Sequence, residues 1–572
     1  MVKIKGGLLL FLVCAAYFVL FCPPNFTGAQ NADMLLCAEN ANINNLGIYP
    51  SDEHIQYLHL SRMAMSATPL LKTLENIIVY RHWHYGYPFY LTSLAAIVPV
   101  KIFNKTFLPG GDLTSWYVLV LRQLSAVYMI GAIVLLIYLL NGFRFTISSA
   151  AIFLFLSSIP CVFGNNMWWH PDSLATLLTV LTIFSLCKDD LKLGTWFYIA
   201  GVFCGLAAGT KVIGIFLLPA VAIYMGISVR NLKGKYIIFI KKGLMFLGLV
   251  SVVIIISNPL LAVRGFAGEI IETLRIQSLK NTLGWEEQWL QNARIWYRES
   301  LSGSFGLWFT YLIACCFCIM GILYDSRKRI FYVLILCWAI PFSCYLLFFV
   351  TNTSGRYFIP VLLPLLSCVC SPSLWRVVRG SSTFKKPIAW LSMLIALFIA
   401  YQFVLYIRTD IATYTQMLNK EKESRAINFY TVLKKNYLEK ISHSAPLIIY
   451  RDYYIYLPPQ QEYVAYNNLW YPVGYEEITG INPDIIVLRK KEIKEQLDEM
   501  YRIIQIPAMA SKRTEDFLAF YKDAHNASLK GFQKLYTTDY AIAFIRNNFS
   551  DVDCNPGTGG YQGKNVFRKT ER

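Results

Sequence analysis

The chain carries groups that could move a proton and groups that could hold an anion, and both kinds stand beside long apolar runs. Asp52 and Glu53 are adjacent carboxylates that follow the first of these runs. A carboxylate in such a place can act as a general base on an attacking hydroxyl group. Lys211 and Arg356 stand beside later runs, and such cations bind phosphate through charge-assisted hydrogen bonds. Carboxylates and cations at one face of an apolar body suit a lipid-linked anionic substrate.

The elements that must position these residues are predicted to be membrane-spanning helices. Of the 572 residues, 55% are hydrophobic and only 15% are charged, whereas soluble proteins carry about 25% charged residues. A spanning helix needs about 20 mostly apolar residues. Eleven runs meet or approach that length and predict eleven spans: 5–22, 117–140, 146–163, 173–187, 194–208, 212–229, 236–257, 307–324, 330–350, 357–370 and 388–407.

A further apolar run, 87–103, is shorter, aromatic and flanked by prolines. We interpret it as an interfacial or re-entrant helix, because counting it as a span would invert every later loop. With the N-terminus inside, the Lys and Arg residues of the short loops then fall almost entirely on the inner face, as the positive-inside rule requires. The outer face receives the segments 24–116, 164–172, 258–306 and 351–356.

The net charge of +18 is therefore mainly a signal of membrane topology. Nucleic-acid partners are excluded, because no basic segment is interleaved with aromatic residues as a nucleic-acid groove requires. No Cys or His cluster has the spacing of a metal site, so the sequence predicts no metal site and no required cofactor, and it leaves open whether a metal ion binds. The span interiors are nearly free of charge, which counts against an ion-coupled transporter.

Composition changes after residue 407. Residues 408–572 are charged and rich in tyrosine, and runs typical of strands (PLIIY, PDIIVL, YAIAFI) alternate with a helical run (KKEIKEQLDEMYRII). This pattern predicts two domains: a transmembrane domain at 1–407 and an extracytoplasmic α/β domain at 408–572.

Six motifs occur in order along the first 370 residues: SDEHIQYL at 51–58, HYGYPFYL at 84–91, VLRQLSAV at 120–127, HPDSLATLL at 170–178, GTKVIGIFLLP at 209–219 and GRYFIPVLLPLL at 355–366. Together they resemble the GT-C superfamily of polytopic glycosyltransferases, in particular the branch of protein O-mannosyltransferases and lipid A aminoarabinose transferases. Phe89 departs from the second proline of a YPPLYY-type segment, and Gln123 and Leu124 depart from an R-L-P-S-A segment.

This resemblance implies a GT-C fold and roles for particular residues. Asp52 would be the catalytic base, and Glu53 would orient the acceptor or help to hold the site, unless it is only a solvated neighbour. Lys211, Arg356 and Arg122 would bind the donor phosphate, although Arg122 could equally be a membrane anchor.

Other residues would surround the sugar and the acceptor. Asp172 and His170 would bind the acceptor or arrange the site, unless His170 is only an interfacial aromatic. His82, His84, Tyr85 and Tyr87 would line the sugar pocket, with structural packing as the alternative.

The function implied by the resemblance is inverting transfer of a sugar from a polyprenyl-phosphate donor to a hydroxyl acceptor on a lipid, glycan or protein. The reaction would take place on the periplasmic or luminal face, with a bacterial inner membrane favoured over the endoplasmic reticulum. A lipid-linked sugar flippase or polysaccharide transporter is the alternative.

Overall fold

The computed structural model describes residues 2–28, 53–107, 114–142, 147–231, 236–282, 285–307, 309–351, 354–375, 385–440, 446–452, 455–458, 463–466, 472–504 and 511–547. Two compact units divide the chain, and the boundary lies between Lys420 and Glu421. The first unit is helical, and the second contains all of the described strands.

The helices of the first unit follow the apolar runs. They are α1 (Val2–Leu20), α2 (Cys22–Asn25), α3 (Glu53–Met63), α4 (Leu70–Ile78), α5 (Tyr87–Phe107), α6 (Thr114–Asn141), α7 (Ile147–Ser157), α8 (Pro160–Asn165), α9 (Asp172–Asp189), α10 (Thr195–Thr210), α11 (Leu218–Asn231), α12 (Tyr236–Ser257), α13 (Arg264–Thr282), α14 (Trp285–Ile295), α15 (Ser302–Phe305), α16 (Thr310–Tyr324), α17 (Arg329–Phe349), α18 (Ile359–Val369) and α20 (Lys385–Asn419). Short 3-10 or π segments join some of them: η3 (Val212–Leu217), η4 (Pro259–Ala262), η5 (Trp296–Leu301) and η6 (Gly355–Phe358).

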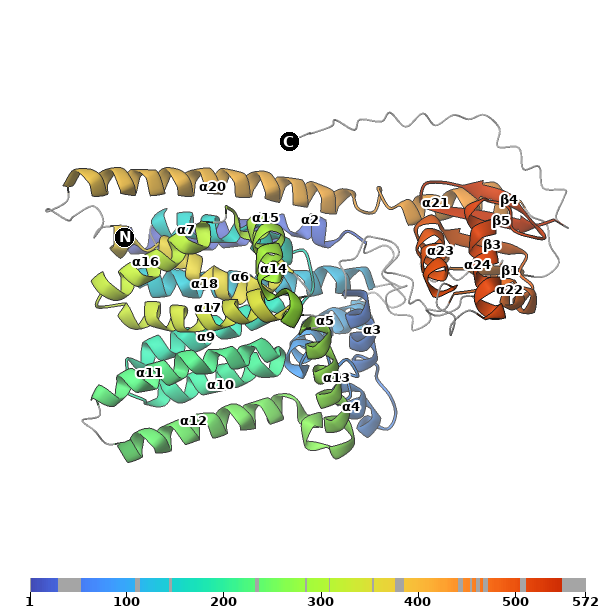
Figure 1. Ribbon diagram of the computed structural model, residues 1–572. Helices are drawn as coiled ribbons and strands as arrows, with labels where there is room; N and C mark the ends of the chain where they lie inside the picture. The colour runs from blue at the N-terminus through green and yellow to red at the C-terminus, as the bar shows by residue number, and fades with distance from the viewer. Residues whose placement is uncertain are drawn as a thin grey trace. The chain divides into compact units, whose positions relative to one another are not determined.

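Within the described residues, seven helices are long and apolar enough to cross a membrane, and a bent pair of helices forms an eighth candidate. A polytopic membrane protein is therefore confirmed, and the count of eleven spans stays a prediction. The long helices lie side by side, and α3, α4, α5 and α13 gather at one of their ends (Figure 1). The predicted span 146–163 is instead two helices, because Pro160 starts a new helix at a position where it needs no N–H partner.

Helix α5 covers the run 87–103, and the backbone at its start is fixed to the end of α10 and to Asn258, which follows α12. The N–H of Gly86 donates to the carbonyl of Thr210 at 3.0 Å, where α10 ends. The N–H of Tyr87 donates to Oδ1 of Asn258 at 2.8 Å, and Asn258 Nδ2 donates to the carbonyl of Gly209 at 3.1 Å. The segment before α5 is thus held against the residues that directly precede Lys211.

Substitution of Gly86 by alanine is expected to destabilise the protein. A Cβ atom at Gly86 would lie 1.5 Å from the Gly209 carbonyl oxygen, so the two backbones would have to separate. Forced overpacking costs about 1–3 kcal/mol, and a clash with backbone belongs at the upper end of that range. The measurement is the apparent Tm in detergent. Gly226→Ala is the control, because a Cβ there meets no atom within 4 Å. An unchanged Tm for Gly86→Ala would contradict the close approach.

Helix α20 runs without a break from Lys385 to Asn419, so the predicted domain boundary at 407 falls inside it. The first unit therefore includes Asp410, which the sequence analysis had assigned to the second domain. The Asp410 side chain is 4% exposed, and neither of its oxygens has a hydrogen-bond partner among the described residues. The membrane domain thus holds a buried carboxyl group that its apolar runs do not reveal.

The second unit is an α/β domain, as its alternating pattern predicts. Its helical elements are α21 (Arg425–Leu433), η8 (Lys434–Leu438), α22 (Tyr475–Ile481), α23 (Lys490–Ile504) and α24 (Lys512–His525), and its strands are β1 (Leu447–Arg451), β2 (Tyr463–Tyr466), β3 (Ile485–Arg489), β4 (Phe532–Thr537) and β5 (Ala541–Arg546). The strand order is β2-β1-β3-β5-β4, with β1 parallel to β2 and β3 and with β5 antiparallel to β3 and β4. Residues of β3, β5, α23 and α24 share one apolar core, which includes Ile486, Phe520 and Phe544.

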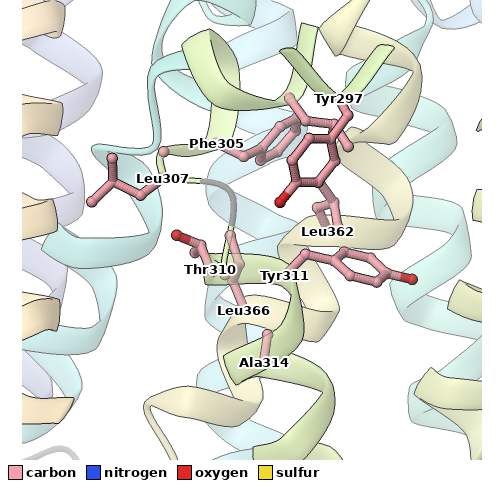
Figure 2. A pocket seen from close by; sticks show the side chains of 10 residues that line it. Tyr297, Phe305, Leu307, Thr310, Tyr311, Ala314, Leu362 and Leu366 are labelled. Carbon is pink, nitrogen blue, oxygen red and sulfur yellow. The ribbon is translucent and has the colours of Figure 1, made fainter. Parts of the chain in front are cut away.

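A small cavity lies between the segment 297–314 and α18 in the first unit (Figure 2). Its volume of about 20 Å³ is room for roughly one water molecule. Thr310 lines this cavity, and its buried hydroxyl group has no partner among the described residues. A space of this size holds no substrate, so the candidate site has to be sought elsewhere.

Candidate active site

Three of the predicted residues meet where α9 begins and α10 ends. Asp172 is the first residue of α9 and is fully buried. Its Oδ1 accepts a hydrogen bond from Lys211 Nζ, and its Oδ2 lies 2.8 Å from His170 Nδ1. Lys211 adopts an extended conformation between α10 and η3, and 13% of its side chain is exposed. The buried carboxylate therefore fixes the position of the ammonium group.

Arg356 lies beside this group of residues, in the 3-10 segment before α18. Its guanidinium carbon is 4.1 Å from the ring centroid of Trp168 and 5.6 Å from that of Tyr357. Lys211 Nζ is 4.8 Å from the same Tyr357 ring. The two cations thus flank one tyrosine ring. The indole N–H of Trp168 is buried and has no acceptor among the described residues, so it adds a donor beside them.

The charges of this cluster follow from burial. Burial lowers the pKa of His170 to about 4, because the charged imidazole loses its hydration. His170 is therefore neutral at pH 7. Burial alone would raise the pKa of Asp172, but the positive charge of Lys211 and the contact with His170 outweigh it and hold the pKa well below its usual range. The Asp172 carboxylate offsets Lys211, so Arg356 leaves the cluster with a net positive charge.

Glu53 and Arg122 form a separate, fully buried ion pair. Arg122 Nε and Nη2 donate to the two carboxylate oxygens of Glu53 at 2.9 and 2.8 Å. Arg122 Nη1 donates to the carbonyls of Asn25 and Thr27 at 3.2 and 2.8 Å. Both charged side chains are 0% exposed. This arrangement favours a structural role for both. For Glu53 such a role is one of the two predicted alternatives, whereas for Arg122 it differs from the predicted contact with the donor phosphate.

The tripeptide 168–170 connects the ion pair to the cluster. Trp168 lies under Arg356, His170 contacts Asp172, and the N–H of Trp169 between them donates to Glu53 Oε1 at 3.1 Å. The Glu53–Arg122 pair therefore holds the backbone that presents both of these side chains. None of the apolar patterns in the sequence shows this link.

The predicted sugar-contacting residues lie on the segment before α5 and at its start. His84 is exposed, and its ring centroid is 5.0 Å from that of His82. Tyr87 is 7% exposed and packs against Tyr80 at 5.6 Å. Tyr85 between them reaches the cluster, because its hydroxyl is 2.8 Å from His170 Nε2. His84 is thus open to a ligand, and Tyr87 is mostly enclosed by packing.

Asp52, the predicted base, lies outside the described residues. Two contributors to the site were not singled out from the sequence: Tyr357 beside both cations, and Asn258 on the segment before α5. Tyr357 follows Arg356 directly in the GRYF sequence, so the motif itself held that signal. Asn258 has no comparable pattern around it.

Comparisons with known proteins give similarity at the level of structure. No protein-family model matches the chain, and no curated protein matches it in sequence. One similar solved structure is ArnT from Cupriavidus metallidurans bound to undecaprenyl phosphate, at 11% identity and a TM-score of 0.42 over 81% of this chain and 88% of that one. Another is the oligosaccharyltransferase AglB from Archaeoglobus fulgidus, in complex with an inhibitory peptide and a dolichol-phosphate. Its identity is 10% and its TM-score 0.37, over 81% of this chain and 66% of that one.

Proposed function

We propose that the protein is a membrane glycosyltransferase that moves a sugar from a polyprenyl-phosphate donor to a hydroxyl acceptor. The observation that carries this proposal is the pair of cations at one end of the apolar bundle. Lys211 is fixed by a buried carboxylate, Arg356 is stacked on Trp168, and both lie beside the Tyr357 ring. Cations held in place before the substrate arrives stabilise developing negative charge at little reorganisation cost.

The charge of the cluster favours a donor with a single phosphate. A sugar linked to a polyprenyl phosphate is a phosphodiester with one negative charge, which the net positive charge of the cluster balances. A diphosphate donor would bring more negative charge than Lys211, Asp172 and Arg356 together offset. The indole N–H of Trp168 supplies a neutral donor for a phosphate oxygen.

The proposed reaction proceeds with inversion at the anomeric carbon. Asp52 takes the proton of the acceptor hydroxyl, and the acceptor oxygen attacks the anomeric carbon from the face opposite the phosphate. The bond from that carbon to the phosphate oxygen breaks, and its electron pair stays on the leaving polyprenyl phosphate. Lys211 and Arg356 stabilise the charge that develops there. No cofactor enters this scheme, and we place the reaction on the periplasmic or luminal face, in a bacterial inner membrane.

The test is sugar transfer by the purified full-length protein in lipid, with a panel of polyprenyl-phosphate sugars. We expect one donor to be consumed and free polyprenyl phosphate to appear. Asp52→Asn is expected to reduce this turnover by about 10²- to 10⁴-fold, the usual contribution of general base catalysis. Asp190→Asn is the control, since it makes the same chemical change at an exposed position after α9.

Two outcomes would contradict the proposal. Full activity of Asp52→Asn would remove Asp52 from the role of base. Movement of lipid-linked sugar across the bilayer without any transfer would favour the flippase alternative.

A further inference from the structure

A cavity of about 630 Å³ lies between α3, α4, α5 and α6, apart from the cation cluster. Its lining includes the apolar or aromatic side chains of Tyr57, Leu60 and Ile97, and also polar ones such as Ser61 and Asn76. Its volume is within the range of ligand-binding pockets. None of the described residues that are proposed for sugar transfer lines this cavity.

The charged residues that line this cavity are both lysines. Lys72 comes from α4 and Lys101 from α5, and no acidic residue is among the described residues that line it. Lys101 Nζ donates one hydrogen bond to the carbonyl of Ala64, which anchors the side chain at the rim and leaves further N–H groups for a ligand. Two ammonium groups without a lining carboxylate favour an anionic occupant.

Helix α4, which forms one side of the cavity, is amphipathic and has no buried residue. Its apolar residues follow helical spacing on one face, and Leu70, Leu71 and Leu74 are 72%, 75% and 46% exposed. Lys72 and Asn76 occupy the opposite side of the helix and line the cavity. An exposed apolar face of this kind belongs in the boundary between lipid headgroups and acyl chains.

Apolar surface also continues beyond the cavity on α5 and α6. Val98, Ile102 and Trp116 are 39%, 61% and 50% exposed. A ligand that enters between the two lysines would therefore meet charge at its head and apolar surface along its tail. Those are the properties of a membrane lipid with an anionic headgroup.

We propose that this cavity binds the phosphate headgroup of an anionic membrane lipid, held by Lys72 and Lys101, with its acyl chains over α4, α5 and α6. The proposal does not depend on the sugar-transfer activity. The cavity nevertheless adjoins the candidate active site, because the Tyr57 ring that lines it packs on Trp169 at 4.8 Å. A bound lipid would thus stabilise the wall that Trp169 shares with the ion pair and the cation cluster.

The experiment is native mass spectrometry of the full-length protein in detergent, titrated with phosphatidylglycerol or phosphatidylcholine of the same acyl chains. A lysine near an anionic headgroup strengthens the binding of that lipid. Two such lysines together give an expected preference for phosphatidylglycerol over phosphatidylcholine of about 10- to 30-fold. Lys72→Gln/Lys101→Gln is expected to abolish this preference. Lys72→Arg/Lys101→Arg is expected to keep it, which shows that charge at these positions is what matters.

The matched control removes the same charge elsewhere at the same end of the bundle. Arg264→Gln/Arg275→Gln changes two exposed residues of α13 and is expected to keep the preference (Figure 1). Equal loss in this control, or wild-type preference in Lys72→Gln/Lys101→Gln, would overturn the proposal. Millimolar inorganic phosphate is expected not to displace the lipid. Displacement by phosphate alone would reveal a plain anion site and overturn the lipid assignment.

Discussion

Replacement of Lys211 by methionine is expected to reduce the rate of sugar transfer by about 10²- to 10³-fold, the usual effect of removing one preorganised electrostatic group. Methionine keeps most of the apolar length of the side chain and removes its charge. The phosphate that leaves would then face Arg356 alone, beside the uncompensated carboxylate of Asp172. The measurement is kcat for the donor identified in the transfer assay, at saturating donor concentration.

The same substitution also affects stability, and the two effects have to be separated. Asp172 is fully buried, and loss of its partner would cost about 3–5 kcal/mol because a buried charge is left unpaired. We expect a lower apparent Tm for Lys211→Met. The double variant Lys211→Met/Asp172→Asn removes both charges and is expected to recover most of the Tm.

Activity of this double variant decides between the roles of Lys211. If the ammonium group stabilises the leaving phosphate, the variant with restored Tm stays inactive. If Lys211 serves only to neutralise Asp172, the double variant regains activity together with stability. The second result would remove Lys211 from the proposed mechanism and leave Arg356 as the cation that binds phosphate.

Much of the fold follows from the sequence because apolar length and periodicity dictate helices and strands directly. The run KKEIKEQLDEMYRII is the helix α23 to the residue, since its charged and apolar positions alternate with helical spacing. The division of 146–163 and the extension of α20 past 407 were not predicted. The division of 146–163 follows from Pro160, which the apolar content of the segment does not show. The extension of α20 depends on its packing against other helices, which apolar content also does not show.

The site could be predicted in part for a similar reason. Motif positions at the ends of spans placed His170, Asp172, Lys211 and Arg356 on one face, and the structure brings these four together. Which carboxylate pairs with which cation could not be predicted, because the predicted outer face carries several carboxylates and several cations. The stacking of Trp168 under Arg356 could not be predicted either, because it depends on the fold of two distant loops.

The buried Glu53–Arg122 pair has the largest expected effect on stability. Arg122→Met would leave the Glu53 carboxylate buried without its guanidinium, and breaking such a pair costs about 3–5 kcal/mol. Four hydrogen bonds from Arg122 to Glu53, Asn25 and Thr27 would be lost as well. We expect a large fall in the apparent Tm in detergent. The double variant Glu53→Leu/Arg122→Met is expected to recover much of it, because a buried ion pair can often be replaced by apolar side chains.

Kinetics of that double variant test whether Arg122 binds the donor or only positions the site. Glu53 follows Asp52 in the chain and accepts the N–H of Trp169, so the pair holds both the start of α3 and the tripeptide 168–170. We therefore expect a lower kcat with an unchanged KM for the donor. A KM that rises by tenfold or more, corresponding to about 1.4 kcal/mol of lost binding, would instead support the predicted contact between Arg122 and the donor phosphate. A variant with normal Tm, kcat and KM would show that the ion pair serves neither purpose, and that other contacts determine the position of Trp169.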